Sequence, residues 1–384
     1  MIDVVVSAPA EQTLSLLLAP MIPILDLSPE LDALWSDLTE ALQGVLRSGH
    51  FIMGPDVQAL EAELASYLGV RHAIGLNSGT DALVIGLRAL GIGSGDEVIT
   101  SPFSFFATAE SISLLNALPV FVDVEEDTFN LDVSKIEAAI TDKTKAIVPV
   151  HLFGHPARMD AVMDVAERYQ LKVLEDCAQS FGARYGTAAT GTIGHAGAYS
   201  FFPSKNLGAY GDGGLLATND DEVALLARKL RAHGSIKKYH NELVGYNSRL
   251  DTMQAAILRV KLPHVDAYNE GRRRVAARYN AAFAALPGLT VPEIVHGHVF
   301  HQYTLRVHGG RRDALAADLA EQGIQTMVYY PIPQDQLPVY KGQYGDFPVS
   351  ALLATEVLSL PIWPQMDEAT QDVVIAAVQS AVAA

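Results

Sequence analysis

Residues 200–214 read SFFPSKNLGAYGDGG and place one lysine, Lys205, among aromatic, small and flexible residues. Lysines usually lie on solvated surfaces, so a loop lysine exposed to water is the ordinary interpretation. The alternative is an amine held in a shielded pocket, where desolvation favours the neutral and nucleophilic form. The remainder of the chain is needed to decide between the two.

Short apolar, β-branched runs alternate with helical patterns before Lys205 and just beyond it. Runs typical of buried strands are RHAIGL (71–76), DEVITSP (96–102), LPVFVDV (118–124), TKAIVPVHLFG (144–154), LKVLED (171–176), AGAYSF (196–201) and GGLLAT (213–218). Helices are expected over 80–90 and near 106–116, 132–140 and 157–169. Such alternation predicts an α/β fold with a mostly parallel sheet and helices on both of its faces.

The pattern changes at two further places along the chain. Long helical periodicity runs through 251–285 with an interruption at Pro263, and shorter strands and helices follow it. The domains that we expect are a tail over 1–21, a large α/β domain over 22–250, connecting helices over 251–285 and a small α+β domain over 286–384.

The bulk composition excludes several classes of partner. Hydrophobic residues make up 49% and charged residues 18% of the 384, as in an ordinary globular protein. The net charge of -17, from 27 basic and 44 acidic residues, predicts no affinity for nucleic acid or anionic membranes. Cys177 is the only cysteine, so an internal disulfide is excluded and a cytoplasmic location is expected. We find no apolar run as long as the roughly 18 residues of a membrane span, and no secretory signal.

The segment GLNSGTDAL (75–83) joins the first strand to a helix through a Ser-Gly-Thr turn. Backbone N–H groups at a helix N-terminus can hold a phosphate without any cation, helped by the Thr80 hydroxyl and by close approach at Gly79. An ordinary helix cap is the alternative, because Ser and Thr are common at that position.

Two more segments follow strands at the edge where open α/β sheets bind ligands. In LEDCAQS (174–180), Asp176 could keep a heteroaromatic nitrogen protonated, and Gln179 could reach a neighbouring ring oxygen. A helix cap or a metal ligand is the alternative for Glu175 or Asp176, but no cluster with ligand spacing surrounds them, so no metal is expected. In SPFSFFATAES (101–111), a phenylalanine could stack on a planar ligand or pack in the core.

Together these segments provide a phosphate cradle, an aromatic face, a carboxylate for a pyridinium and a lysine for an aldehyde. These four features match the phosphate, the planar ring, the pyridine nitrogen and the aldehyde of pyridoxal 5′-phosphate (PLP), so Lys205 is predicted to be a Schiff-base lysine. Its small and apolar neighbours would then lower the cost of the neutral amine.

Beyond these chemical arguments, the chain resembles the DegT or StrS family, the PLP-dependent nucleotide-sugar aminotransferases of fold type I. The resemblance runs from about Ile22 to the C-terminus and rests on SGTDAL, the FFAT segment, PVHLFG, EDCAQS, SFFPSKNLGAYGDGG, RAHGS and GYNSRLDTMQAA. It implies a fold-type I transferase, with a mostly parallel sheet flanked by helices and a smaller C-terminal α+β domain.

The resemblance also implies roles around the cofactor ring. Lys205 would carry the Schiff base and shuttle a proton, and Asp176 would face the pyridine nitrogen, so these two are the expected catalytic residues. Phe105 would stack on the ring, and Gln179 would lie near the ring hydroxyl.

At the phosphate end, the resemblance assigns Gly79, Thr80 and Ser200 to the cofactor phosphate. Asn247, in GYNSRLD, resembles an asparagine that reaches the phosphate of the neighbouring subunit, which implies a homodimer with shared active sites. A helix N-cap is the alternative for Asn247.

For function, the resemblance implies transfer of an amino group, with L-glutamate as the expected donor, onto a ketone of a nucleotide-linked hexose. The stretch HGSIKKYHNELVGYNSRLD (233–251) is closer to members that aminate sugar carbon 3 than to those that act at carbon 4. Such reactions belong to amino sugar biosynthesis, including that of polysaccharide or O-antigen. The alternatives are a dehydratase-like or other PLP enzyme and a PLP-binding regulator without enzymatic activity. Relatives that act as dehydratases can carry His in place of the lysine, so Lys205 favours transamination.

One stretch departs from the family pattern. Many relatives have a histidine in a YPxPxH stretch, whereas residues 329–336 read YYPIPQDQ, with Gln334 and Asp335 there. The sugar or nucleotide contacts of that loop are therefore not assigned from the resemblance.

Overall fold

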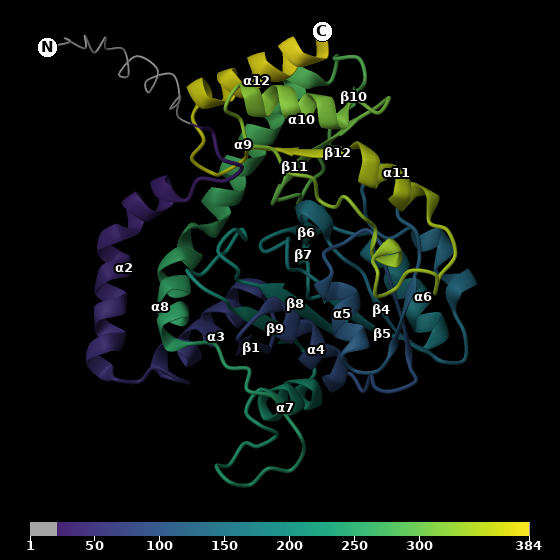
Figure 1. Cartoon of the computed structure of the whole chain (residues 1–384). Coiled ribbons are helices and arrows are strands. Elements are labelled where there is room, and N and C mark those ends of the chain that lie inside the picture. The colour runs from purple at the N-terminus through teal and green to yellow at the C-terminus, as the bar shows by residue number, and fades with distance from the viewer. Residues whose placement is uncertain (1–20, 384) are drawn as a thin grey trace, which may run out of the picture.

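A seven-stranded sheet forms the centre of the computed structural model, which describes residues 21–383 (Figure 1). In spatial order its strands are β1 (His72–Leu76), β9 (Gly214–Thr218), β8 (Ala196–Ser200), β5 (Lys172–Asp176), β4 (Thr144–Val148), β2 (Glu97–Thr100) and β3 (Leu118–Phe121). Strand β9 pairs antiparallel with β1 and β8, and the other neighbours pair in parallel. The mostly parallel sheet expected from the sequence is confirmed. Residues 1–20 of the expected tail lie outside the described residues.

Both faces of this sheet are buried, which explains why its strands are apolar throughout. In β4, Ala146 and Val148 join the core on one face, and Ile147 joins the core on the other. The first face is covered by α4 (Gly79–Ala89), α5 (Ala107–Ser113) and α7 (Asp221–Leu230). The second face is covered by α3 (Pro55–Leu68), α6 (Met159–Tyr169) and α8 (Thr252–Lys261).

The stretch 132–140, predicted as a helix, instead forms two short 3-10 turns, Val133–Lys135 and Glu137–Ala139. The Asp132 carboxylate accepts hydrogen bonds from the backbone N–H and the hydroxyl of Ser134, at 3.1 and 2.6 Å. Local bonds of this kind compete with the bonds of a regular helix, and here they hold the turn.

The C-terminal part has its own sheet and its own core. Helix α9 (Val265–Phe283) follows α8 after the 3-10 turn Leu262–His264, which contains Pro263. Strands β10 (Leu289–Thr290), β11 (Tyr303–Val307) and β12 (Val357–Leu360) form an antiparallel sheet. Helices α9, α10 (Arg312–Glu321) and α12 (Glu368–Ala383) supply the apolar side chains that pack with it. The domain boundaries set out above stay predictions.

Three further pieces complete the described chain. Helix α2 (Ser28–Ser48) packs along α8 through Leu34, Leu38 and Ile257, and α11 (Pro348–Glu356) precedes β12. Strands β6 (Arg184–Tyr185) and β7 (Ala188–Ala189) form a small hairpin. Among residues 21–383, no helix has the length and apolar character needed to cross a membrane.

Candidate active site

A cavity of about 600 Å³ lies where strands β5 and β8 end and where the C-terminal part meets the large sheet. Its walls come from the turn before α4, the start of α5, the ends of β5 and β8, and residues 301–302 and 329–330. Of the eight residues predicted to bind the cofactor, seven line it, namely Gly79, Thr80, Phe105, Asp176, Gln179, Ser200 and Lys205.

One end of the cavity is built by the N-terminus of α4. Ser78 caps this helix, because its hydroxyl accepts a hydrogen bond from the backbone N–H of Asp81 at 3.1 Å. A Cβ atom on Gly79 would lie 2.6 Å from the Cβ of Ser200, so only glycine allows the turn to approach β8 this closely. Exposed N–H groups and the hydroxyls of Thr80 and Ser200 are thereby gathered at one end, an arrangement that fits a phosphate group.

The carboxylate of Asp176 lies at the end of β5, where it is buried. It accepts hydrogen bonds from the hydroxyl of Thr108 at 2.8 Å and from the backbone N–H of Ala178 at 3.1 Å. Burial raises the pKa of Asp176, while these two hydrogen bonds and the charge of Lys205 act in the opposite direction. A carboxylate in this setting gains from a cation beside it, and the protonated nitrogen of a pyridine ring is such a cation.

Lys205 follows β8 in a tight turn, with its backbone N–H bonded to the carbonyl of Phe202 at 2.9 Å. Burial lowers the pKa of its amine to about 8, and the charge of Asp176 opposes this shift. A larger share of this amine is therefore neutral near pH 7 than for a lysine in water. The structure thus favours the shielded amine over the surface loop lysine.

The remaining wall is aromatic and polar. Phe105 is 58% exposed as a residue, and the centroid of its ring lies 6.3 Å from that of the Tyr330 ring. The side chain of Gln179 accepts a bond from the N–H of Phe153 at 2.7 Å and donates one to the Tyr330 hydroxyl at 3.0 Å. These bonds fix Gln179 beside Asp176, and the exposed ring of Phe105 is available to stack on a planar ligand.

Asn247 is the one predicted site residue that does not line this cavity. Its side-chain oxygen accepts a bond from Arg249 at 2.5 Å, and its backbone forms an isolated bridge with Ala232. Asn247 is not a helix cap either, because α8 begins at Thr252 with Asp251 before it.

Several lining residues had not been predicted, and three of them bear on the chemistry, namely Thr108, His301 and Tyr330. Thr108 stands in the FFAT segment, where its place near the start of a helix that follows a strand could have indicated a role. The other two come from the C-terminal part, and no local pattern connects them with the large sheet. Burial and the charge of Lys205 lower the pKa of His301 well below its usual range, so its imidazole is neutral.

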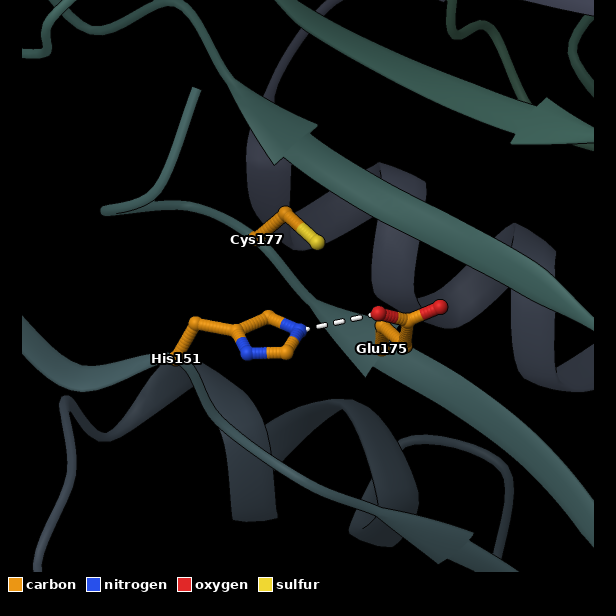
Figure 2. Close-up of side chains that lie close together, drawn as sticks. All are labelled: His151, Glu175 and Cys177. Atoms are coloured by element: carbon orange, nitrogen blue, oxygen red, sulfur yellow. Dashed lines mark hydrogen bonds and ion pairs between the residues drawn. The ribbon is translucent and has the colours of Figure 1, made fainter. Parts of the chain in front are cut away.

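A second polar cluster is made of His151, which follows β4, Glu175 in β5 and Cys177 just after β5 (Figure 2). The Nδ1 atom of His151 accepts a hydrogen bond from the N–H of Ala157, so Nε2 carries the proton and donates a hydrogen bond to the Glu175 carboxylate at 2.9 Å. Three backbone N–H groups, of Gly191, Ile193 and Gly194, also donate to the Glu175 carboxylate. Burial raises the pKa of the Cys177 thiol. The ring nitrogens of His151 and the carboxylate of Glu175 thus find their partners within the chain, so we regard this pair as part of a structural hydrogen-bond network.

Comparison with known proteins places this site in a family context. The sequence model of the DegT/DnrJ/EryC1/StrS aminotransferase family matches residues 33–379. A pleiotropic regulatory protein of Geobacillus stearothermophilus is 50% identical, over 92% of this chain and 96% of the relative. The UDP-N-acetyl-3-dehydro-alpha-D-glucosamine 3-aminotransferase of Acidithiobacillus ferrooxidans is 47% identical, over 90% and 94%. The crystal structure of S. venezuelae DesV in complex with a ketimine intermediate superposes with a TM-score of 0.92 at 43% identity, covering 95% of this chain and 99% of DesV.

Proposed function

Because the chain belongs to the DegT/DnrJ/EryC1/StrS aminotransferase family, we propose that it transfers an amino group from L-glutamate to carbon 3 of a nucleotide-linked keto-hexose. Enzymes of this family depend on PLP. The observation that carries the proposal is that Lys205 and Asp176 share the walls of one cavity, with the Gly79 turn at its end.

Two features support a sugar nucleotide as the acceptor. The Acidithiobacillus ferrooxidans relative is named for amination at carbon 3 of a UDP-linked sugar. The cavity of about 600 Å³ lies within the range of small-molecule sites and extends past the cofactor residues to Tyr329 and Tyr330. Polar and aromatic side chains together suit a ligand that has both a sugar and a planar base.

The residues that line the cavity would have different roles in the reaction. Bound PLP supplies a ring that delocalises the negative charge left when a proton is removed beside the amino group. Lys205 would move that proton, since a pKa of about 8 allows its amine to lose and regain a proton near neutral pH. Asp176 would keep the ring nitrogen protonated by charge pairing, and the Gly79 turn would hold the phosphate.

A labelling experiment tests the reaction directly. We would incubate the PLP-loaded protein with 15N-labelled glutamate and a panel of UDP- and dTDP-linked 3-keto and 4-keto hexoses. Mass spectrometry should detect 15N in the product of a 3-keto sugar. A product that loses water without gaining nitrogen would instead identify a dehydratase-like enzyme. Tight PLP binding without turnover of any sugar would favour a regulator.

We further propose that the working unit is a homodimer in which Asn247 completes the phosphate site of the partner. Among the described residues that line the cavity, Lys205 is the only lysine and there is no arginine. Since Lys205 is assigned to the aldehyde, the dianionic phosphate needs further neutral hydrogen-bond donors. Residues 233–246 form a loop that projects beyond α7 (Figure 1). This loop exposes 86% of Tyr239 and 81% of Val244, as a surface that another chain covers would do.

Mixing two inactive variants tests the shared site. Lys205→Ala and Asn247→Asp should each be inactive alone, the second because a carboxylate repels the phosphate. In a mixed dimer one site carries both defects and the other is intact. Random exchange makes half of the dimers mixed, so activity should return to about a quarter of the wild-type value. No recovery despite demonstrated subunit exchange would mean that Asn247 serves its own chain.

A further inference from the structure

We infer that Gln334 is a positioning residue of the active site, which holds the segment 102–108 from the C-terminal part of the chain. This inference rests on the proposed function, because that segment carries Phe105 and supports Asp176. Gln334 stands in the stretch YYPIPQDQ, whose sequence departs from the family pattern. It does not line the cavity, so it acts through its neighbours and not on a ligand.

Three hydrogen bonds join Gln334 to this segment. Its backbone N–H donates to the carbonyl of Pro102 at 2.8 Å, and its side-chain Nε2 donates to the carbonyls of Ser104 and Phe105, each at 3.2 Å. The side chain is buried, and its Oε1 has no hydrogen-bond partner among residues 21–383. The reverse orientation of the amide would direct an oxygen at two carbonyl oxygens, so the donor role is fixed by the surroundings.

The position of these bonds matters because residues 101–105 have no regular secondary structure. They connect the end of β2 with the start of α5, and Phe105 is largely exposed, with its ring tilted against that of Tyr330. The carbonyl of Phe105 also accepts the N–H of Thr108 at 3.2 Å, so Gln334 holds the chain where α5 starts. Fixing this backbone fixes the direction in which the ring of Phe105 faces the cavity.

Segment 102–108 is also connected by hydrogen bonds to the carboxylate of Asp176. The hydroxyl of Ser104 lies 3.0 Å from that of Thr108, which donates its only proton to Asp176. Ser104 must therefore be the donor to Thr108. By holding the backbone of Ser104, Gln334 supports a chain of hydrogen bonds that ends on Asp176. One amide from the C-terminal part thus steadies two groups that are proposed to contact the cofactor.

The test replaces Gln334 with methionine, which has similar length but no donor. The control is Gln336→Met, an exposed residue of the same 3-10 turn. In the cofactor-free protein, hydrogen exchange at residues 102–108 should be faster in Gln334→Met and unchanged in the control. Loss of two hydrogen bonds should weaken PLP binding roughly 10-fold, measured by the visible absorbance of the bound cofactor.

A double-mutant cycle with Phe105→Ala separates a specific role from a general loss of packing. If Gln334 acts through this segment, Gln334→Met should weaken PLP binding less in the Phe105→Ala background than in the wild type. An equal loss in both backgrounds, or unchanged exchange at 102–108, would overturn the inference. If Phe105→Ala alone left PLP affinity unchanged, the stacking role would fail, and the exchange result would still decide on Gln334.

Gln334→Glu provides an independent test that does not depend on the methionine variant folding. A protonated carboxyl can still donate to a carbonyl, whereas a carboxylate would repel both carbonyl oxygens. PLP affinity of this variant should therefore fall as the pH rises through the pKa of the new glutamate, relative to the wild type. A parallel pH dependence in the two proteins would contradict the inference.

Discussion

Replacing Lys205 with alanine is expected to lower the rate of amino transfer by about 10³-fold or more, while PLP still binds. The variant removes the only lysine that residues 21–383 contribute to the cavity wall. The turn around Gly79, the ring of Phe105 and the carboxylate of Asp176 remain. Transfer of 15N from glutamate measures the rate, and dialysis against free PLP measures binding. Lys172→Ala, at an exposed position of β5, is the matched control and should retain full activity.

The attachment of the cofactor to Lys205 can be examined separately. Borohydride should fix PLP to the peptide that contains Lys205, and labelling of another lysine would refute the assignment. Because burial lowers the pKa of Lys205 to about 8, its ammonium form predominates below that pH and its neutral amine above it. The rate at which cofactor-free protein attaches PLP should therefore rise with pH and level off above about 8. A rate that still climbs at pH 10 would indicate an ordinary, solvated lysine.

Much of the site could be predicted because its parts are local in sequence. Two of its parts can be recognised within a few residues: a strand followed by Ser-Gly-Thr and a helix, and a strand that ends in Asp176. The steric reason for Gly79 became visible only in the structure, where Ser200 of a different strand lies against it. Sequence spacing predicts which edge of the sheet a residue reaches, and not which side chain it meets there.

Apart from Thr108, which lies in the FFAT segment, the missed residues named above depend on contacts between distant parts of the chain. His301 and Tyr330 reach the cavity because the small sheet packs over the end of the large one, and Gln334 meets Phe105 for the same reason. Periodicity carries no information about such packing. The predicted helix over 132–140 was wrong for a different reason, because the hydrogen bonds that Ser134 donates to the Asp132 carboxylate favoured a tighter turn.

Asp176→Asn is expected to lower the rate of amino transfer by about 10²-fold while changing PLP affinity much less. An opposite charge within a few ångströms shifts a pKa by about 1–3 units, so the loss of the carboxylate leaves the pyridine nitrogen unprotonated in most molecules. The unprotonated ring accepts negative charge less well, whereas the phosphate and stacking contacts that hold the cofactor are untouched. Turnover and PLP affinity are to be measured on the same preparation, and near-normal turnover would show that the role is wrong.

The same variant should also alter Lys205 in a predictable direction. The charge of Asp176 raises the pKa of Lys205 against the larger effect of burial, so its removal should move the pKa below 8. The pH profile of PLP attachment in Asp176→Asn should therefore level off at a lower pH than in the wild type. Asp212→Asn is the matched control, because Asp212 also lines the cavity, whereas the shift of the Lys205 pKa comes from burial and from the charge of Asp176. A shift of equal size in both variants would show that Lys205 responds to the total charge of the cavity and not to Asp176 itself.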